Sequence, residues 1–346
     1  MKKVVVGISG GVDSSVAAPL LKQEGYEVIG ITFRFTEEFD SSNAVKVCEK
    51  LGIKHHILDY RKIFKEKVID KFIEDYNIGL TPNPCVLCNR YVKLKFLYDA
   101  MIEFDADYMA TGHYAKVSGG RLYKGTDLNK DQTYFLCNMT RKQLEHILFP
   151  LDGIDKGMVR QIALDNNLIT AELKDSTDVC FITSNFKVYM QDKIKNETGP
   201  VINVLTNEKI GTHNGLNKYT IGQRRGLNIG GTKDRMYVVG KDIKENILYI
   251  ATGDDNDYLV STSCILDNVN LFTDEKITAC KAKFRYRQEE VLVKLKYLDD
   301  NRVEVIYENV KSVTPGQVCC FYSGNECLGG GIITEVRKNG EKLWYL

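Results

Sequence analysis

The first part of the chain alternates apolar runs with stretches of helical spacing. Runs rich in Val and Ile predict strands over Lys3–Ser9, Tyr26–Phe33, Lys54–Leu58 and Tyr108–Thr111. Apolar residues at helical spacing predict helices over Ser15–Glu24, Ser42–Leu51, Arg61–Tyr76, Asn89–Phe104 and Asp155–Asn167. This alternation predicts an α/β fold with a doubly wound parallel sheet, in which ligands bind beyond the carboxyl ends of the strands.

From about Gly199 the pattern changes to short Val, Ile, Tyr and Phe runs separated by Gly, Asn and Asp. These runs predict strands over Met236–Val239, Leu248–Ala251, Ile277–Arg285, Val291–Tyr297, Val303–Tyr307, Gln317–Tyr322 and Gly331–Val336. We expect two small β-rich domains here, the last a β-barrel. The predicted domains are 1–198, 199–258 and 259–346.

The composition indicates a globular protein but does not indicate what the protein binds. Of the 346 residues, 43% are hydrophobic and 27% charged, which is typical of a globular protein. The net charge of +1 neither favours nor excludes nucleic acid. No signal-peptide pattern and no run long enough to span a membrane is present, so we expect a cytoplasmic protein without a membrane partner. Ten cysteines in such a chain are not expected to form a structural disulfide framework.

The stretch Gly7–Ser15, GISGGVDSS, lies between the first predicted strand and the first predicted helix. Gly10 and Gly11 let the backbone approach a ligand closely, and the free N–H groups of a helix start attract phosphate. No Lys follows the glycines, which distinguishes this loop from a GxxxxGK[ST] P-loop. Asp13 is available to help hold Mg²⁺ on a pyrophosphate. The pattern resembles the PP-loop of ATP pyrophosphatases; the alternative is an ordinary Gly/Ser turn.

Cys85 and Cys88 lie in TPNPCVLCN, where two prolines restrict the loop. Asn89 is expected to cap the following helix, which would place Cys88 beside a helix N-terminus and favour its thiolate. A zinc half-site or a thioredoxin-like redox pair are the alternatives.

Other candidates carry weaker signals on spacing alone. Cys180, in DSTDVCFI, is either a core residue or a thiol at an exposed turn. His113 follows a predicted strand and is either a structural histidine or a functional one. On spacing alone, Lys130-Asp131-Gln132 is interpreted as a solvated turn that caps a helix. Two basic and aromatic segments, Tyr219–Gly226 and Lys281–Arg287, raise the possibility of RNA binding through phosphate contacts and base stacking.

Taken together, these motifs resemble the bacterial tRNA-specific 2-thiouridylase family (MnmA, or TrmU) along essentially the whole chain. SGGVDSS, TPNPxxxCN, ATGHY, KDQxYFL, FPL, CFI and YTIGQRRGL occur in the family's order. The resemblance implies a HUP-like PP-loop domain that uses ATP and Mg²⁺. It also implies thiolation of the wobble uridine in the anticodon stem-loop of tRNAs for Lys, Glu and Gln. Sulfur would come from a persulfide carrier protein or from sulfide.

The resemblance also implies residue roles. Cys88 would be the nucleophile and Cys180 the persulfide carrier, with Asp13 at the catalytic centre. ATP would be bound by Gly7, Ile8, Ser9, Gly10, Gly11, Val12, Asp13, Ser14, Phe33 and Gly112. Contacts to tRNA would come from Asn83, Pro84, Cys85, Lys130, Asp131, Gln132, Arg285 and Tyr286. His113 and Gln317 match further site positions.

One departure from the family pattern concerns Cys85, because many members have Asp there. With Cys88 and Cys180 it makes three cysteines, and three thiolates can hold a [4Fe–4S] cluster that leaves one iron open. The sequence therefore leaves a persulfide relay and a cluster on Cys85, Cys88 and Cys180 as alternatives.

Two other classes of function compete with this interpretation. A small-molecule PP-loop ligase or amidotransferase would share the first motif but has no use for Cys88, Cys180 or a basic-aromatic β-rich half. A non-catalytic RNA-binding protein would not need an intact SGGVDSS.

Overall fold

The computed structural model describes residues 1–174, 179–182, 189–190, 193–194, 197–227, 229, 235–254, 256–299 and 301–346. The chain forms two compact units. Unit 1 comprises Met1–Ile69, Pro84–Phe181 and Tyr322–Gly329, and unit 2 comprises Asp70–Asn83, Ile182–Phe321 and Gly330–Leu346. The expected boundaries 1–198, 199–258 and 259–346 remain predictions.

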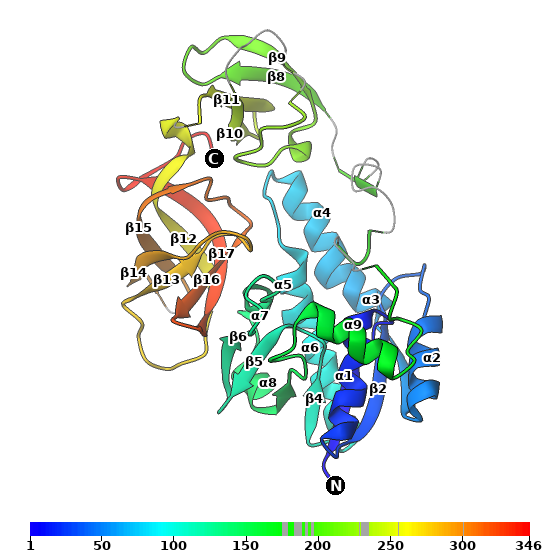
Figure 1. Ribbon diagram of the computed structural model, residues 1–346. Coiled ribbons are helices and arrows are strands. Elements are labelled where there is room, and N and C mark those ends of the chain that lie inside the picture. Colours follow the sequence, from blue (N-terminus) through cyan, green and yellow to red (C-terminus); the bar gives the residue numbers. More distant parts are fainter. Residues whose placement is uncertain are drawn as a thin grey trace. The chain divides into compact units, whose positions relative to one another are not determined.

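Unit 1 is built on a five-stranded sheet (Figure 1). Its strands are β1 (Lys3–Gly7), β2 (Glu27–Arg34), β3 (Lys54–Asp59), β4 (Tyr108–Ala110) and β7 (Ile147–Leu148). They run parallel in the order β3-β2-β1-β4-β7, so the predicted α/β parallel sheet is confirmed. The order reverses between β1 and β4, and in open α/β sheets ligands bind beyond the carboxyl ends of the strands at such a reversal point.

Helices cover both faces of this sheet. The long helices are α1 (Val12–Gln23), α2 (Ser42–Leu51), α6 (Leu94–Glu103) and α9 (Lys156–Asp165). Helix α1 packs beside α2 and α9, and α6 packs on β1 and β4 (Figure 1). Right-handed crossovers in this strand order place α1 and α6 on opposite faces. Fully buried Val4, Val6 and Val16 anchor the core between β1 and α1.

Two helical runs contain π-helical turns. The first consists of α3 (Arg61–Phe64), the π turn η1 (Lys65–Ile69) and α4 (Asp70–Asn77). The second consists of α5 (Pro84–Cys88), the π turn η2 (Asn89–Lys93) and α6. The second run begins at Pro84, a residue type suited to the first position of a helix. The predicted start at Asn89 is therefore wrong by one turn.

Short elements complete unit 1. A hairpin is formed by β5 (Ala115–Ser118) and β6 (Arg121–Lys124). Two short helices follow, α7 (Thr133–Leu136), which begins directly after Gln132, and α8 (Arg141–His146), which was not predicted. A capping box formed by Thr140 and Gln143 begins α8.

The first part of unit 2 is a four-stranded sheet of order β10-β11-β8-β9. Its strands are β8 (Thr198–Asn203), β9 (Lys209–Asn214), β10 (Met236–Asp242) and β11 (Ile247–Thr252). A short 3₁₀ turn, η3 (Leu216–Lys218), lies between β9 and β10, and a second, η4 (Asp257–Leu259), follows β11.

The second part is a closed six-stranded β-barrel, as expected. Its strands are β12 (Val260–Leu271), β13 (Ala279–Lys283), β14 (Val291–Tyr297), β15 (Val303–Lys311), β16 (Val318–Ser323) and β17 (Glu326–Lys338). Pairing of β12 with β17 closes the ring, and β18 (Glu341–Lys342) pairs with the end of β17. The first residues of β17 belong to unit 1, where Glu326 and Cys327 pair with Tyr123 and Leu122 of β6.

Among the residues described, no helix combines the length and the apolar character needed to cross a membrane.

Candidate active site

The glycine-rich loop follows β1 directly and leads into α1 at the reversal point of the sheet. Gly10 adopts a φ of +83°, a conformation that favours glycine. Ser14 bridges the loop, because its hydroxyl accepts from the Ser9 backbone N–H at 3.1 Å and donates to the Gly11 carbonyl at 3.0 Å. Gly11 occupies the N-cap of α1 without a capping side chain, so the backbone N–H groups of the first turn face a potential anion.

Asp13 lies in the first turn of α1 and is held by two distant residues. Its Oδ1 accepts from the Tyr114 hydroxyl at 2.8 Å and from Nζ of Lys156 at 2.6 Å. Gly112 approaches from the end of β4, and a Cβ built there would lie 2.6 Å from the Asp13 carbonyl carbon. Sequence reasoning missed Lys156 and the role of Tyr114, because neither is near Asp13 along the chain.

The oxygen atoms in this loop have the chemistry that Mg²⁺ requires. The Asp13 carboxylate and the hydroxyls of Ser9 and Ser14 are hard oxygen donors, the kind that Mg²⁺ binds together with phosphate oxygens. Phe33, expected near adenine, lies half-buried in β2 and stacks on Phe35 with ring centroids 5.5 Å apart. These residues fit a nucleotide triphosphate with its metal.

The cysteine segment does not have the predicted local structure. Cys88 is the last residue of α5 and the helical run continues through it, so it does not lie at a helix N-terminus. Asn89 does not act as a cap; its side-chain amide donates to the Phe135 carbonyl at 2.9 Å. Cys85, the second residue of α5, is the thiol at the helix start. Because the π turn η2 continues the helical run from α5 into α6, no new helix begins at Asn89, and the predicted cap has no helix start to bind.

Burial opposes ionisation of the Cys88 thiol. The residue is 8% exposed, and desolvation raises the pKa of its thiol to about 12. The Lys93 ammonium and a hydrogen bond from the Lys93 backbone lower this pKa, but they do not overcome burial. Burial therefore disfavours the thiolate form of Cys88 in the protein without substrate, and the nucleophile role of Cys88 remains a prediction.

Lys93 is the cation shared by all three site thiols. Desolvation raises the pKa of Cys85 and of Cys180, and the Lys93 charge opposes this rise in each. Cys180 is near enough for its charge to raise the pKa of both Cys85 and Cys88. The charge of Lys93 thus acts on all three thiols, and nothing in the sequence pattern indicated this lysine.

Cys180 itself is accessible. The residue is exposed, although enough protein surrounds the thiol to desolvate it partly. Its neighbour Phe181 is buried and packs edge-on against Phe64, with ring centroids 5.7 Å apart. The core alternative for Cys180 is therefore wrong.

His113 joins the same cluster. Its Nε2 lies 3.2 Å from the Lys93 ammonium and its Nδ1 2.8 Å from the Thr111 hydroxyl. Because an ammonium only donates, Nε2 accepts and the proton is assigned to Nδ1. Desolvation and the Lys93 charge hold the pKa of His113 well below its usual value, so the ring is neutral.

A cluster site on these thiols is not preformed. All ten cysteines are free, and among the residues described no three His, Cys, Asp or Glu side chains are arranged to hold a metal ion. Three thiolates would suit a [4Fe–4S] cluster chemically, but the present arrangement does not fit one.

In the Lys130–Gln132 segment, the side chains of Asp131 and Gln132 form hydrogen bonds within the protein that stabilise the local fold. Asp131 is 4% exposed, and its carboxylate accepts from the backbone N–H of Gly125 and from the hydroxyl of Thr133. The Gln132 side chain accepts from the Tyr114 backbone N–H at 3.0 Å. Lys130 is half-buried.

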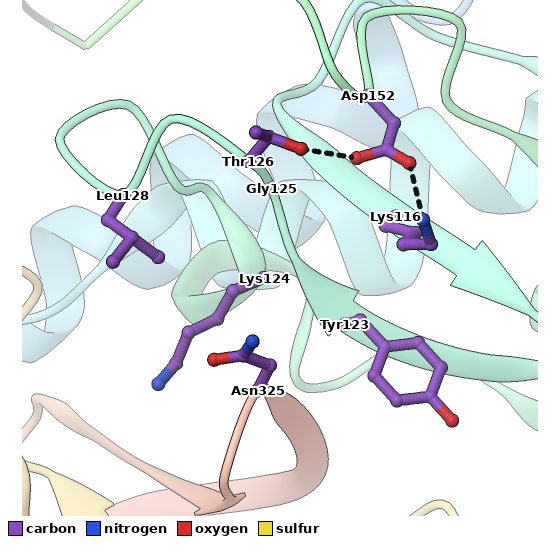
Figure 2. Close-up of a pocket in the computed structure, with 8 residues that line it drawn as sticks. All are labelled: Lys116, Tyr123, Lys124, Gly125, Thr126, Leu128, Asp152 and Asn325. Atoms are coloured by element: carbon purple, nitrogen blue, oxygen red, sulfur yellow. Dashed lines mark hydrogen bonds and ion pairs between the residues drawn. The ribbon is translucent and has the colours of Figure 1, made fainter.

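A pocket of about 600 Å³ adjoins this segment (Figure 2). Figure 2 shows Lys116 and Thr126 both directed at Asp152, at 3.1 and 3.2 Å. Lys124 donates to the Gly324 carbonyl and lies over the Tyr322 ring. None of the eight labelled lining residues belongs to the glycine-rich loop or the cysteine segment.

The remaining expected site residues lie in unit 2, apart from Pro84, which begins α5. Arg285 follows β13 in a turn, and its guanidinium donates to the Ile221 carbonyl at 2.7 Å and the Thr314 hydroxyl at 2.6 Å. Tyr286 and Asn83 are half-buried. Gln317 donates from its side-chain amide to the Thr81 carbonyl at 2.6 Å.

A doubly wound sheet with a SGGVDSS loop at its reversal point defines an ATP-binding domain of the PP-loop, HUP-like class. Family models match along the chain: a tRNA methyl transferase HUP domain over residues 2–184, a PRC-barrel domain of the same family over 187–252 and an aminomethyltransferase β-barrel domain over 261–333. The chain belongs to the tRNA-specific 2-thiouridylase (MnmA) family.

Curated members of that family match over nearly the full length. The tRNA-specific 2-thiouridylase MnmA of Geobacillus thermodenitrificans is 45% identical, covering 99% of this chain and 98% of its own. The Bacillus subtilis protein of that name is 44% identical with the same coverage. Among solved structures, a 4-thiouridine synthetase in complex with RNA and bound ATP is 18% identical with a TM-score of 0.38, covering 52% of this chain and 45% of that chain.

Proposed function

We propose that this protein is a tRNA 2-thiouridylase that replaces the C2 oxygen of the wobble uridine by sulfur, consuming ATP. The observation that carries the proposal is that Cys85 and Cys88 lie three residues apart in α5, where the charges of Lys93 and Cys180 act on both thiols, in the same compact unit as the glycine-rich loop. Family membership supports tRNA as substrate and thiolation as the reaction. Its substrate would place the protein in the cytoplasm.

The first step activates the uridine. The C2 oxygen attacks the α-phosphorus of ATP, pyrophosphate leaves, and N3 loses its proton to solvent. Backbone N–H groups of Gly10–Ser14 bind the phosphates, and Lys156 orients Asp13. Mg²⁺ held by Asp13 and the serine hydroxyls would neutralise phosphate charge when bound.

The second step transfers sulfur. Cys180 first receives a sulfur atom from a persulfide donor and becomes Cys180–S–SH. The terminal sulfur attacks C2, AMP leaves, and C2 is then joined to Cys180 through two sulfurs. Cys88 attacks Sγ of Cys180, which forms a Cys88–Cys180 disulfide and releases 2-thiouridine after N3 is reprotonated. A dithiol reductant returns both cysteines to thiols.

The environments of the two cysteines suit these roles. Exposure of Cys180 allows a carrier protein to reach it. Burial of Cys88 keeps its thiol protonated, so it is protected from solvent oxidants until tRNA is bound. Lys93 lowers the thiol pKa at both positions and is the residue best placed to stabilise a thiolate during transfer.

The [4Fe–4S] alternative rests on Cys85 as the third thiol. The three cysteines would have to rearrange to hold such a cluster. Adenylation and the persulfide relay do not require the cluster. Reconstitution with iron and sulfide under anaerobic conditions distinguishes the two mechanisms.

The decisive experiment is thiolation of unmodified tRNA by anaerobically purified protein with ATP, Mg²⁺ and either sulfide or a persulfide donor. Nucleosides are identified by mass spectrometry and AMP is quantified. With the persulfide donor and a dithiol reductant we expect 2-thiouridine and AMP in equal amounts, because sulfide alone cannot form the Cys180 persulfide without an oxidant. Product that requires prior iron reconstitution would favour the cluster over the relay.

A small-molecule PP-loop ligase is the remaining candidate from another class. It predicts saturable AMP release with a small acceptor and no RNA. If no 2-thiouridine forms with either sulfur source, the proposed function is wrong and this alternative is favoured.

A further inference from the structure

The π turn η2 lies between Cys88 and helix α6. It holds one residue more than a regular helical turn, because the Leu94 backbone N–H donates to the carbonyl of Asn89, five residues earlier. Turns of this kind are rare within helices and occur mostly singly. Contacts from outside the helical run therefore determine where the additional residue lies, and those described below all belong to unit 1.

The first two residues of the turn are held by α7 and the turn that follows it. Asn89 is buried, and its side-chain amide donates to the Phe135 carbonyl at 2.9 Å. Its neighbour Arg90 donates from the guanidinium to the Asn138 carbonyl, also at 2.9 Å. Carbonyl groups at the end of a helix have no partner within that helix, so they are available to such donors. The start of the π turn is thus fixed against α7.

Helix α7 is itself fixed by contacts that do not involve the π turn. Its first residue, Thr133, is fully buried. Before it, the Gln132 backbone N–H donates to the Tyr114 carbonyl at 2.9 Å, and the Tyr114 backbone N–H donates to the Gln132 side chain at 3.0 Å. The Tyr114 hydroxyl in turn donates to Asp13. We therefore expect α7 and the glycine-rich loop to stay in place when the side chains of the π turn are changed.

We propose that Asn89 and Arg90 are positioning residues for sulfur transfer, which hold the additional residue of the helical run at η2 and so set the direction of the Cys88 side chain. The inference rests on the proposed function, in which Cys88 releases the product by attacking Cys180. Successive residues of an α-helix are turned by about 100°, so a shift of the additional residue into α5 would rotate Cys88 by a similar angle. The end of the π turn has its own contact, since the Lys93 ammonium lies near His113.

The test uses Asn89→Leu and Arg90→Met, each of which removes one of these hydrogen bonds. Tyr91→Leu is the matched control, because Tyr91 lies in the same turn and is 47% exposed. Protein that carries the Cys180 persulfide is freed of reductant and given ATP, Mg²⁺ and saturating tRNA for a single turnover. We expect AMP formation within about twofold of wild type in each of these proteins, because the glycine-rich loop keeps its own contacts.

Release of the product should be impaired in both variants. Free tRNA containing 2-thiouridine should appear about tenfold more slowly or worse, since misplacing a reacting group by about 1 Å has effects of this size. The tRNA should instead accumulate joined to Cys180 through two sulfurs, as a covalent product on a denaturing gel. A dithiol added after denaturation should separate tRNA from protein, which identifies the link as a disulfide. Cys88→Ser should give the same product, whereas wild type and Tyr91→Leu should not.

Hydrogen exchange at the Leu94 backbone amide is a readout independent of activity. It should become faster in Asn89→Leu and Arg90→Met but not in Tyr91→Leu, because this amide forms the hydrogen bond across the π turn. Unchanged exchange in both variants overturns the proposal, as does free product at the wild-type rate.

Loss of AMP formation in both variants also overturns the proposal, because the two residues would then support the fold of the whole unit rather than the direction of Cys88. Wild-type protein that makes no 2-thiouridine contradicts the proposed function, and absence of the covalent product in Cys88→Ser contradicts the relay. In either case, exchange at Leu94 still tests whether Asn89 and Arg90 hold the turn.

Discussion

Lys156, the first residue of α9, lies 2.6 Å from the carboxylate of Asp13 in the first turn of α1. The lysine is mostly shielded from solvent, with 15% of its side chain exposed. A partly buried ion pair at a helix start sets the orientation of the carboxylate and adds a positive charge where phosphates are expected.

Replacement of Lys156 by Met should impair adenylation. Loss of one charge-assisted hydrogen bond costs about 1.5–3 kcal/mol, which corresponds to roughly 10–100-fold in kcat/KM for ATP. Pyrophosphate release with saturating tRNA measures the effect, and exposed Lys142→Met is the control. A Lys156→Met protein with wild-type kcat/KM would show that Asp13 does not need this partner.

Gly112→Ala should disrupt the glycine-rich loop. The added methyl would lie 2.6–2.7 Å from backbone atoms of Asp13 and Ser14, so the loop or β4 must move. We expect loss of measurable ATP binding by calorimetry. Gly211→Ala, where the new methyl meets its nearest neighbour at 3.5 Å, should bind ATP normally. Normal ATP affinity in Gly112→Ala would mean that the loop tolerates displacement.

The reactivity of Cys88 should depend steeply on pH. Its pKa is raised to about 12, so the thiolate fraction increases about tenfold per pH unit through the neutral and mildly alkaline range. Alkylation by iodoacetamide, followed by peptide mass spectrometry, should show this slope without a plateau up to pH 9. A slope that begins to flatten around pH 8.5 would indicate an ordinary thiol, whose pKa is about 8.5.

Lys93→Met should slow that alkylation further, because the ammonium lowers the pKa of Cys88. The same variant should retain AMP formation and lose 2-thiouridine. Exposed Lys95→Met, two residues away, serves as its control. Faster alkylation in Lys93→Met would contradict the electrostatic role of the lysine.

Serine substitutions separate the two sulfur mechanisms. In the persulfide relay, Cys88→Ser and Cys180→Ser each abolish 2-thiouridine while tRNA binding persists, and Cys85→Ser remains active. In the cluster mechanism all three variants are inactive. Mass spectrometry of tRNA nucleosides with a persulfide donor decides between these patterns, and substantial product from Cys88→Ser would rule out its assigned role.

Elements with strong local patterns were predictable from sequence. Helix α2 and strand β14 have the predicted bounds, because periodic apolar residues and a stop at Gly52 or a turn define them. Strand β12 was missed because buried Ser261 and Ser263 made it look polar; their hydroxyls contact Tyr307 and Glu304 inside the barrel. The strand's pairing across the barrel supplies these partners, and no local pattern encodes them.

The residues of the site that belong to sequence motifs were predictable, but the charged residues that contact them were not. The order of motifs identified the glycine-rich loop and Cys85, Cys88 and Cys180. Lys93 and Lys156 were not found, because a lone lysine gives no signal until folding places it beside a thiol or a carboxylate. The error at Asn89 has a similar cause, since a π turn has no recognised sequence signature.

The π turn Asn89–Lys93 also has a consequence for insertions and deletions in this family. In a regular α-helix, residues five apart point roughly 140° away from each other, whereas the i→i+5 bonding of a π turn brings them into line. Lys93 is five residues after Cys88. Deletion of a single residue in this turn would restore a regular α-helix with the lysine four residues after the thiol, and residues four apart lie on the same helix face. This segment can therefore lose one residue without separating the lysine from the thiol, whereas the same deletion elsewhere in a regular helix would turn the following side chains by about 100°.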